Sequence, residues 1–247
     1  MPQAGFVHYL PIATTLVSIA FLIAISLRAI PRKWPPHLLW WAIGITTYGL
    51  GTALESSVTL FGNSPELTRW WYWAGAILGG YPLATGTVYL LMKRRLAHLC
   101  TAISLAVVVF ASVAVFLTPL NTDALEPHRP SGAVIGWQWV RLLTPFINGY
   151  AALFLVGGAF YSAFFFAFKH NKGRRALGTT LIAIGGILPG IGGGMAKAGI
   201  VEALYIGELV GLILIWLGYH FCITDKRPPV PASDNTADNN PAEPAPA

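Results

Sequence analysis

The sequence predicts an all-α, polytopic membrane protein, a bundle of seven transmembrane helices with its N-terminus outside and its C-terminus in the cytoplasm. Three observations carry this prediction: a low content of charge, seven long apolar stretches, and a one-sided distribution of basic residues. Of the 247 residues, 55% are hydrophobic and only 11% are charged, whereas a soluble domain carries about 25% charged residues. Such a chain needs an apolar solvent, which excludes an ordinary soluble fold.

Seven stretches of the chain are long enough to cross a bilayer. A hydrocarbon core of about 30 Å requires roughly 20 predominantly apolar residues in a helix. We place the spans at residues 8–30, 37–61, 70–92, 97–118, 142–168, 176–197 and 201–223. Together they define a seven-transmembrane domain over residues 1–225. Residues 226–247 contain six prolines and almost no large apolar residue, so we expect a disordered cytoplasmic tail there.

The basic residues gather in alternate loops. By the positive-inside rule, loops rich in Lys and Arg stay in the cytoplasm, and an odd number of spans then places the N-terminus outside. We therefore expect a multi-pass protein of the plasma or inner membrane. The net charge of +6 is explained by topology and lipid headgroups, and it does not require nucleic acid as a partner. The cytoplasmic set holds 12 of the 16 basic residues: Arg28, Arg32, Lys33, Lys93, Arg94, Arg95, Lys169, Lys172, Arg174, Arg175, Lys226 and Arg227.

The second and third spans form a helical hairpin that carries the most deeply placed acid of the chain. Tyr48, Thr52, Glu55 and Thr59 recur at helical spacing and share one face. A charged side chain in lipid costs at least about 2.5–3.5 kcal/mol on insertion scales, so Glu55 must face the protein interior and have a partner there. Two interpretations stay open, a structural hydrogen bond to a neighbouring helix and a contact with a ligand or ion.

Polar residues of several spans fall at one depth, in the outer half of the predicted bundle. Aromatic residues at the start of the third span lie beside them, and those on its inward face are candidates to line a cavity. This arrangement predicts an outward-facing pocket for a small ligand. The predicted ligand-binding residues are Glu55, Tyr72, Asn148, Tyr205 and Glu208, and Arg69, Arg141 and Lys197 are predicted to form structural ion pairs.

Two spans contain helix-weakening residues. Pro82 is expected to kink the third span. The sixth span has six glycines and a proline between residues 185 and 194, a composition that is tolerated in a membrane where freed backbone groups are buried or line a wet cavity. We predict a discontinuous helix with a hinge at Pro189, Gly190 and Gly192. Broken helices build binding sites in transporters, so this span favours transport as an alternative function.

Several other chemistries find no support in the sequence. Cys100 and Cys222 fall near cytoplasmic helix ends, where thiols stay reduced, and no Cys/His spacing resembles a zinc site. Haem would need paired histidines inside the spans, but the six histidines lie near helix ends or in a loop. Retinal would need a lysine in the middle of the last span, which has none. We expect no enzyme activity, no catalytic residues, no cofactor and no metal.

The hairpin 48–95 resembles the corresponding hairpin in the N-terminal seven-transmembrane sensor region of bacterial histidine kinases. The resemblance rests on GLGTALE at the end of one helix, RWWYW at the start of the next and LIAIGGILPGIGG in the sixth span. It implies a sensor fold in which Glu55 is the polar position to carry over. The tail of about 22 residues holds no kinase domain, so such a module would signal through a cytoplasmic partner.

The first functional hypothesis is a sensor or receptor with an outward-facing pocket for an unknown small ligand. The second is a small-solute transporter or permease that uses the sixth span as its gate. The third is a structural membrane subunit whose polar residues hold its helices together. These hypotheses differ in what they require of the polar residues: a ligand site, an accessible path, or a dry bundle in which each buried charge is paired.

Overall fold

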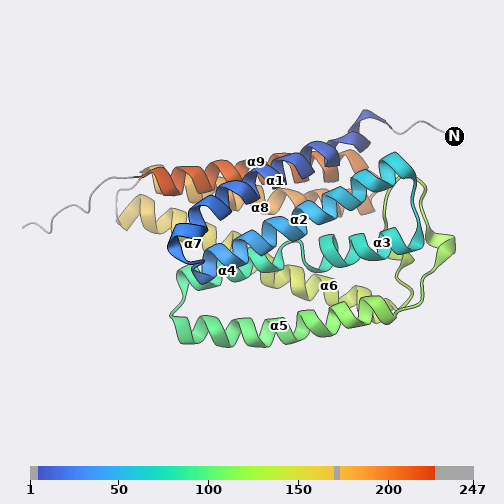
Figure 1. Cartoon of the computed structure of the whole chain (residues 1–247), viewed down its shortest axis with the longest axis horizontal. Coiled ribbons are helices and arrows are strands. Elements are labelled where there is room, and N and C mark those ends of the chain that lie inside the picture. Colours follow the sequence, from blue (N-terminus) through green and yellow to red (C-terminus); the bar gives the residue numbers. More distant parts are fainter. Residues whose placement is uncertain (1–4, 170–172, 226–247) are drawn as a thin grey trace, which may run out of the picture.

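The computed structural model describes residues 5–169 and 173–225, and within them every regular element is helical. The predicted tail, 226–247, lies outside the described residues. The long elements run side by side as one bundle, with α1, α8 and α9 along one side and α5 along the opposite side (Figure 1). The predicted all-α helical bundle is therefore confirmed.

Six helical stretches within the described residues are long and apolar enough to cross a membrane. They match six of the seven predicted spans to within a few residues. The six are Phe6–Arg32, Pro65–Leu91, Arg94–Leu117, Gln138–Phe168, Gly173–Lys197 and Val201–Thr224.

The remaining predicted span corresponds to α2 (Pro36–Phe61), which is 26 residues long but is not among those six. Its threonines, serines, glycines and Glu55 make it less apolar than the others. It packs between α1 (Leu10–Ala29) and α4 (Tyr81–Leu91). A seventh crossing and the orientation of the bundle remain predictions.

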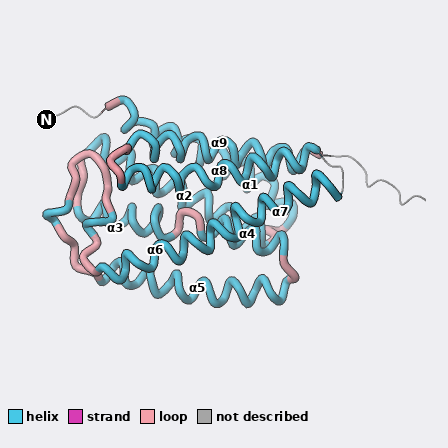
Figure 2. The backbone as a smooth tube through the Cα atoms, turned by 180° about the vertical axis from the view of Figure 1, so that it is seen from behind, coloured by secondary structure: helices cyan, strands magenta, loops and turns pink. Residues whose placement is uncertain are grey.

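The first span begins with η1 (Phe6–Tyr9) and ends with η2 (Ile30–Arg32). Span four is the single helix α5 (Arg94–Leu117). The loop that follows contains two short 3₁₀ turns, η4 (Thr122–Ala124) and η5 (Gly132–Val134). An isolated antiparallel bridge pairs Leu120, before η4, with Ile135, after η5. This loop lies at the end of the bundle where the described chain begins (Figure 2).

The third span is interrupted halfway along its length. It starts as α3 (Pro65–Trp71), continues as the π-helix η3 (Tyr72–Ile77), and resumes as α4 only at Tyr81. Residues 78–80 form a turn in the middle of the bundle (Figure 2). Pro82 has no N–H to continue the helical ladder, and the Thr47 hydroxyl donates to the carbonyl of Leu78 at 3.4 Å. The expected disturbance at Pro82 is thus a full break.

The fifth span is helical throughout but contains two π-helical segments. It consists of α6 (Gln138–Ala151), the π-helix η6 (Ala152–Gly157), α7 (Gly158–Phe164) and a second π-helix, η7 (Phe165–Lys169). Pro145 lies inside α6. Single-turn π segments are rare in helices and often mark functional sites.

The sixth span differs from its prediction. We expected a discontinuous helix, but α8 (Gly173–Lys197) continues through Pro189 without a break. The turn after Lys197 contains Gly199, whose φ of +95° suits glycine, and α9 (Val201–Thr224) then returns alongside α8. The interruption predicted here lies in the third span instead. A hinge motion at Pro189 stays a prediction.

Glycines allow α8 and α9 to pack backbone against backbone. A methyl group placed on Gly185 would lie 2.5 Å from the carbonyl oxygen of Gly211, and one on Gly211 would lie 2.6 Å from that of Gly185. A methyl group on Gly192 would lie 2.5 Å from the Ala203 oxygen. By contrast, Gly190 faces open space. Small residues at such contacts let membrane helices approach closely, so Gly185 and Gly192 of α8 and Gly211 of α9 form a packing seam.

Candidate functional site

The structure brings Glu55 of α2 and Glu208 of α9 together in the interior. Their carboxyl groups lie within hydrogen-bonding reach of one another. Glu55 is only 2% exposed. One oxygen of each group, Oε2, is inaccessible to solvent and accepts no hydrogen bond from a donor in the described residues. The two acids that the sequence placed in the outer half are therefore direct neighbours.

Aromatic residues surround this carboxyl pair, which is defined here as Glu55 and Glu208. The indole Nε1 of Trp71 donates to Oε1 of Glu55 at 2.7 Å. The Tyr48 hydroxyl donates to the backbone oxygen of Glu208 at 2.9 Å. Tyr205 is 2% exposed and stacks edge-on against His8, with ring centroids 5.7 Å apart. The pair is thus enclosed by rings from three spans.

The ion pairs predicted for this region are not formed with the carboxyl pair. Arg69 contacts Glu66 at 3.5 Å and donates to the Thr118 oxygen at 3.0 Å. Arg141 and Lys197 are exposed and make no ion pair among the residues that the structure describes. Glu55 instead has another carboxyl as its neighbour and accepts a hydrogen bond from Trp71.

Two further predicted ligand residues lie away from the pair. Tyr72 is buried, and its hydroxyl lies 2.6 Å from the Thr144 hydroxyl of α6. It therefore joins the third span to the fifth. Asn148 is exposed on the outer surface of α6 and makes no side-chain hydrogen bond within the described ranges. Of the five predicted ligand residues, Glu55, Tyr205 and Glu208 come together, whereas Tyr72 and Asn148 do not join them.

An ion pair in the loop covers the neighbouring end of the bundle. Arg129 donates to both carboxylate oxygens of Glu126, one of them at 2.9 Å, and to the Ala196 oxygen of α8 at 3.0 Å. Its hydrogen bonds with Glu126 raise the pKa of the Arg129 guanidinium above its ordinary value. Asn63 donates to the backbone oxygens of Glu126 and Arg129, at 2.7 and 3.0 Å. The loop is thereby tied to the ends of two helices, α2 and α8.

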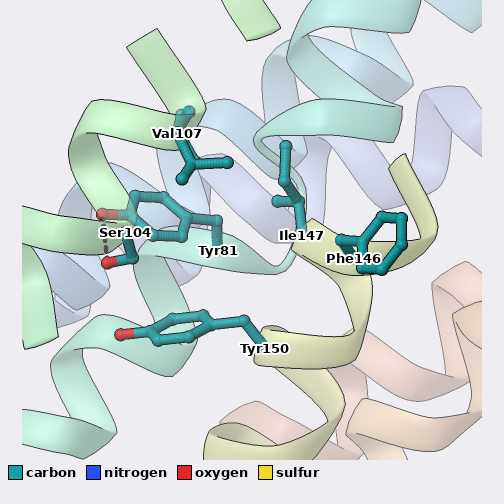
Figure 3. A pocket seen from close by; sticks show the side chains of 7 residues that line it. Tyr81, Ser104, Val107, Phe146, Ile147 and Tyr150 are labelled. Atoms are coloured by element: carbon teal, nitrogen blue, oxygen red, sulfur yellow. Dashed lines mark hydrogen bonds between the residues drawn. The ribbon is translucent and has the colours of Figure 1, made fainter. Parts of the chain in front are cut away.

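A cavity of about 220 Å³ lies beside the break in the third span. Its walls come from the start of α4, the middle of α5 and the Pro145 region of α6 (Figure 3). Phe146 is 77% exposed and Val107 is 43% exposed, so the cavity opens sideways between spans, toward the side that lipid covers in a membrane. The lining residues are Tyr81, Ser104, Val107, Val108, Phe146, Ile147 and Tyr150.

Three hydroxyl groups are the polar features of this otherwise apolar cavity. The Tyr81 and Ser104 hydroxyls lie 3.1 Å apart, and the Tyr150 hydroxyl lies 3.4 Å from that of Thr85. The Tyr81 and Tyr150 rings face each other with centroids 5.5 Å apart (Figure 3). Apolar walls with a few convergent polar groups are typical of small-molecule sites. A molecule with one hydrogen-bonding group could be oriented here.

This cavity was not predicted from the sequence, although the elements that form it contain residues that could have indicated it. Pro82 lies beside the break in the third span, Pro145 lies inside α6, and Ser104 is a hydroxyl residue in the middle of the fourth span. No group of three or more His, Cys, Asp or Glu residues that could hold a metal is found within the described residues.

No protein-family model, curated protein or solved structure matches the chain.

Proposed function

We propose that this polytopic membrane protein is a receptor for a small, mostly apolar molecule with one hydrogen-bonding group. The molecule would enter from the bilayer into the cavity between α4, α5 and α6. The observation that carries the proposal is the position of the cavity, with the hydroxyls of Tyr81 and Ser104 at its inner wall and Phe146 at its mouth. A volume of about 220 Å³ is below the roughly 300–1,000 Å³ of drug-sized pockets, which favours a single acyl chain or a small ring.

A receptor also needs an element that responds to its ligand. Tyr81 is the first residue of α4, directly after the turn at residues 78–80. A molecule that contacts Tyr81 therefore acts on the point where the two halves of the third span meet. The helix α6, which forms another wall of the cavity, is followed directly by the π-helix η6. Interrupted helices can change their relative angle at small cost, because few backbone hydrogen bonds cross the break. The resemblance to sensor regions points the same way, and the response would pass to a cytoplasmic partner.

Thermal stability of the full chain in lipid nanodiscs tests the binding step, with 1-decanol, decanoic acid and a short-chain benzoquinone as probes. Val107→Trp fills the cavity, and Val109→Trp is its matched control, since Val109 lies on the same helix, is 53% exposed and does not line the cavity. We expect at least one probe to raise the melting temperature of the wild type and of Val109→Trp but not of Val107→Trp. Equal shifts in all three proteins, or in none, would contradict the proposal.

Transport is the second candidate, because discontinuous helices build the central sites of many transporters and the third span is discontinuous. An uptake measurement distinguishes a transporter from a receptor. A probe that stabilises the wild type is tested for uptake into proteoliposomes, with Val107→Trp as the control. Uptake that depends on an open cavity would assign a carrier, whereas binding without uptake keeps the receptor assignment.

A further inference from the structure

The carboxyl pair Glu55–Glu208 lies apart from the cavity and has no role in the function proposed above. Its contact poses an electrostatic problem, because two carboxylates within hydrogen-bonding reach cannot both be ionised in apolar surroundings. The described residues supply no Lys or Arg within salt-bridge distance of either group. A proton or a cation must therefore neutralise at least one of the two carboxyls.

A metal ion does not fit this position well. A hard cation takes six or more oxygen ligands, but the groups around the pair are mostly donors or rings. Trp71 directs an N–H at Oε1 of Glu55, and the Tyr48 hydroxyl is directed at the Glu208 backbone oxygen. A cation would also hold the carboxyl oxygens apart, whereas here they lie within direct hydrogen-bonding reach. A proton needs only the two oxygens.

The geometry points to a proton-binding site in which Glu55 and Glu208 hold one proton between their carboxyl groups. Both Oε2 atoms are buried and accept no hydrogen bond from a donor in the described residues, so a proton on one carboxyl can be donated to the other. The balance is simple: one carboxyl donates, one carboxylate accepts, and the net charge of the pair is −1. The Trp71 N–H stabilises the charged member.

The other titratable groups that face the pair come from each neighbouring element. Tyr48 lies on α2 and Tyr205 on α9, while His8 of η1 stacks on the Tyr205 ring. Beyond Tyr205 lies the loop pair of Glu126 and Arg129, close enough for its charges to act on the Tyr205 hydroxyl. Exposed Glu202 and Lys197 lie at the ends of α9 and α8. Tyr205 thus separates the carboxyl pair from the charged surface of the loop.

Infrared difference spectroscopy on the full chain in nanodiscs tests this directly, because a protonated carboxyl has a C=O stretch that a carboxylate lacks. The wild type should show one such band near neutral pH, and the band should shift in D₂O. Glu55→Gln and Glu208→Gln should each lose it, since a glutamine amide donates to the remaining carboxylate and no shared proton is needed. The matched control Glu202→Gln, exposed on the same helix, should keep it.

Three results would overturn the site. A wild type without the band has no shared proton, and a band that survives in both glutamine variants belongs elsewhere. Stabilisation of the wild type by sodium chloride relative to choline chloride, lost in Glu55→Gln and Glu208→Gln, would assign a cation site. The double variant Glu55→Gln/Glu208→Gln is the control for misfolding of the single variants, because its two amides can hydrogen-bond each other and keep the contact.

Discussion

The indole nitrogen of Trp71 lies 2.7 Å from Oε1 of Glu55, and Trp71 is the last residue of α3 before the chain changes to π-helical winding. The acid of the second span is therefore fixed by the residue at which the third span begins to depart from α-helical geometry. This hydrogen bond joins the carboxyl pair to the interrupted helix, whose other end forms a wall of the cavity.

Replacing Trp71 with phenylalanine should lower the stability of the folded protein by about 1.5–3 kcal/mol, the range for hydrogen bonds to charged groups. The substitution removes the N–H donor but keeps an aromatic ring. Reversible unfolding in mixed micelles measures the change. Trp70→Phe is the matched control, because Trp70 is 47% exposed and makes no side-chain hydrogen bond within the described residues. Equal losses in both variants would mean that ring size, and not the hydrogen bond, matters.

Stability should depend on pH with a defined sign. If the folded pair holds a proton that two solvated carboxyls would release, unfolding releases one proton, so the free energy of unfolding falls as pH rises. The slope is at most about 1.4 kcal/mol per pH unit for one proton. The loss begins above the pH at which a free glutamate ionises and continues until the folded pair itself gives up the proton. Unfolding titrations at several pH values measure the slope.

Glu208→Gln provides the control for that slope. With one carboxyl removed there is no shared proton, so the pH dependence in the neutral range should flatten. An unfolding free energy that increases with pH in the wild type would have the wrong sign and would contradict the shared proton, whatever its magnitude.

Alanine at Gly185 or Gly211 should destabilise the protein strongly, because the added methyl group would meet a backbone oxygen of the other helix at 2.5 or 2.6 Å. Overpacking of this kind costs about 1–3 kcal/mol or more. Gly190→Ala is the matched control in the same span, since nothing lies within 4 Å of the added group and alanine favours the helix by up to about 1 kcal/mol. A lower free energy of unfolding for Gly190→Ala than for Gly185→Ala would contradict the close packing of α8 against α9.

Arg129→Gln should loosen the loop without unfolding the bundle. The substitution removes hydrogen bonds to Glu126 and to the Ala196 oxygen, and partial exposure limits the loss to about 1 kcal/mol. Hydrogen exchange should increase across the loop between α5 and α6. Arg141→Gln, at an exposed arginine without an ion pair among the described residues, should leave the exchange unchanged. Unaltered exchange in both would show that other contacts hold the loop.

The positions of the spans could be predicted from hydropathy, because a bilayer imposes one length on every crossing. The order of the helices around the bundle could not, since an apolar face can pack against any neighbour. Asn148 illustrates the limit: it lies within the fifth span, as predicted, but a rotation of 100° per residue decides whether a side chain faces the interior or the outer surface. The same uncertainty concealed the direct contact between Glu55 and Glu208.

The glycines of the sixth span show how one signal can have two meanings. Their number predicted a weak, hinged helix, yet Gly178, Gly185 and Gly192 recur every seven residues and all three lie against α9. That spacing indicates a packed face. In the third span, Gly79, Gly80 and Pro82 occupy a short stretch, and there the helix does break. Regular spacing along one face, more than glycine content, distinguishes the two cases.

The modest hydropathy of α2 has a consequence for biogenesis. A helix with Glu55 and many hydroxyl residues gains little by entering lipid alone, because insertion scales penalise an acidic residue within a span. In the folded protein, polar groups of α2 form hydrogen bonds with other helices. The Thr52 hydroxyl lies 2.9 Å from the Thr15 hydroxyl of α1, and the Trp71 indole of α3 donates to Glu55. Stable insertion of α2 should therefore depend on its flanking segments, so that the translocon releases the first three segments as one unit.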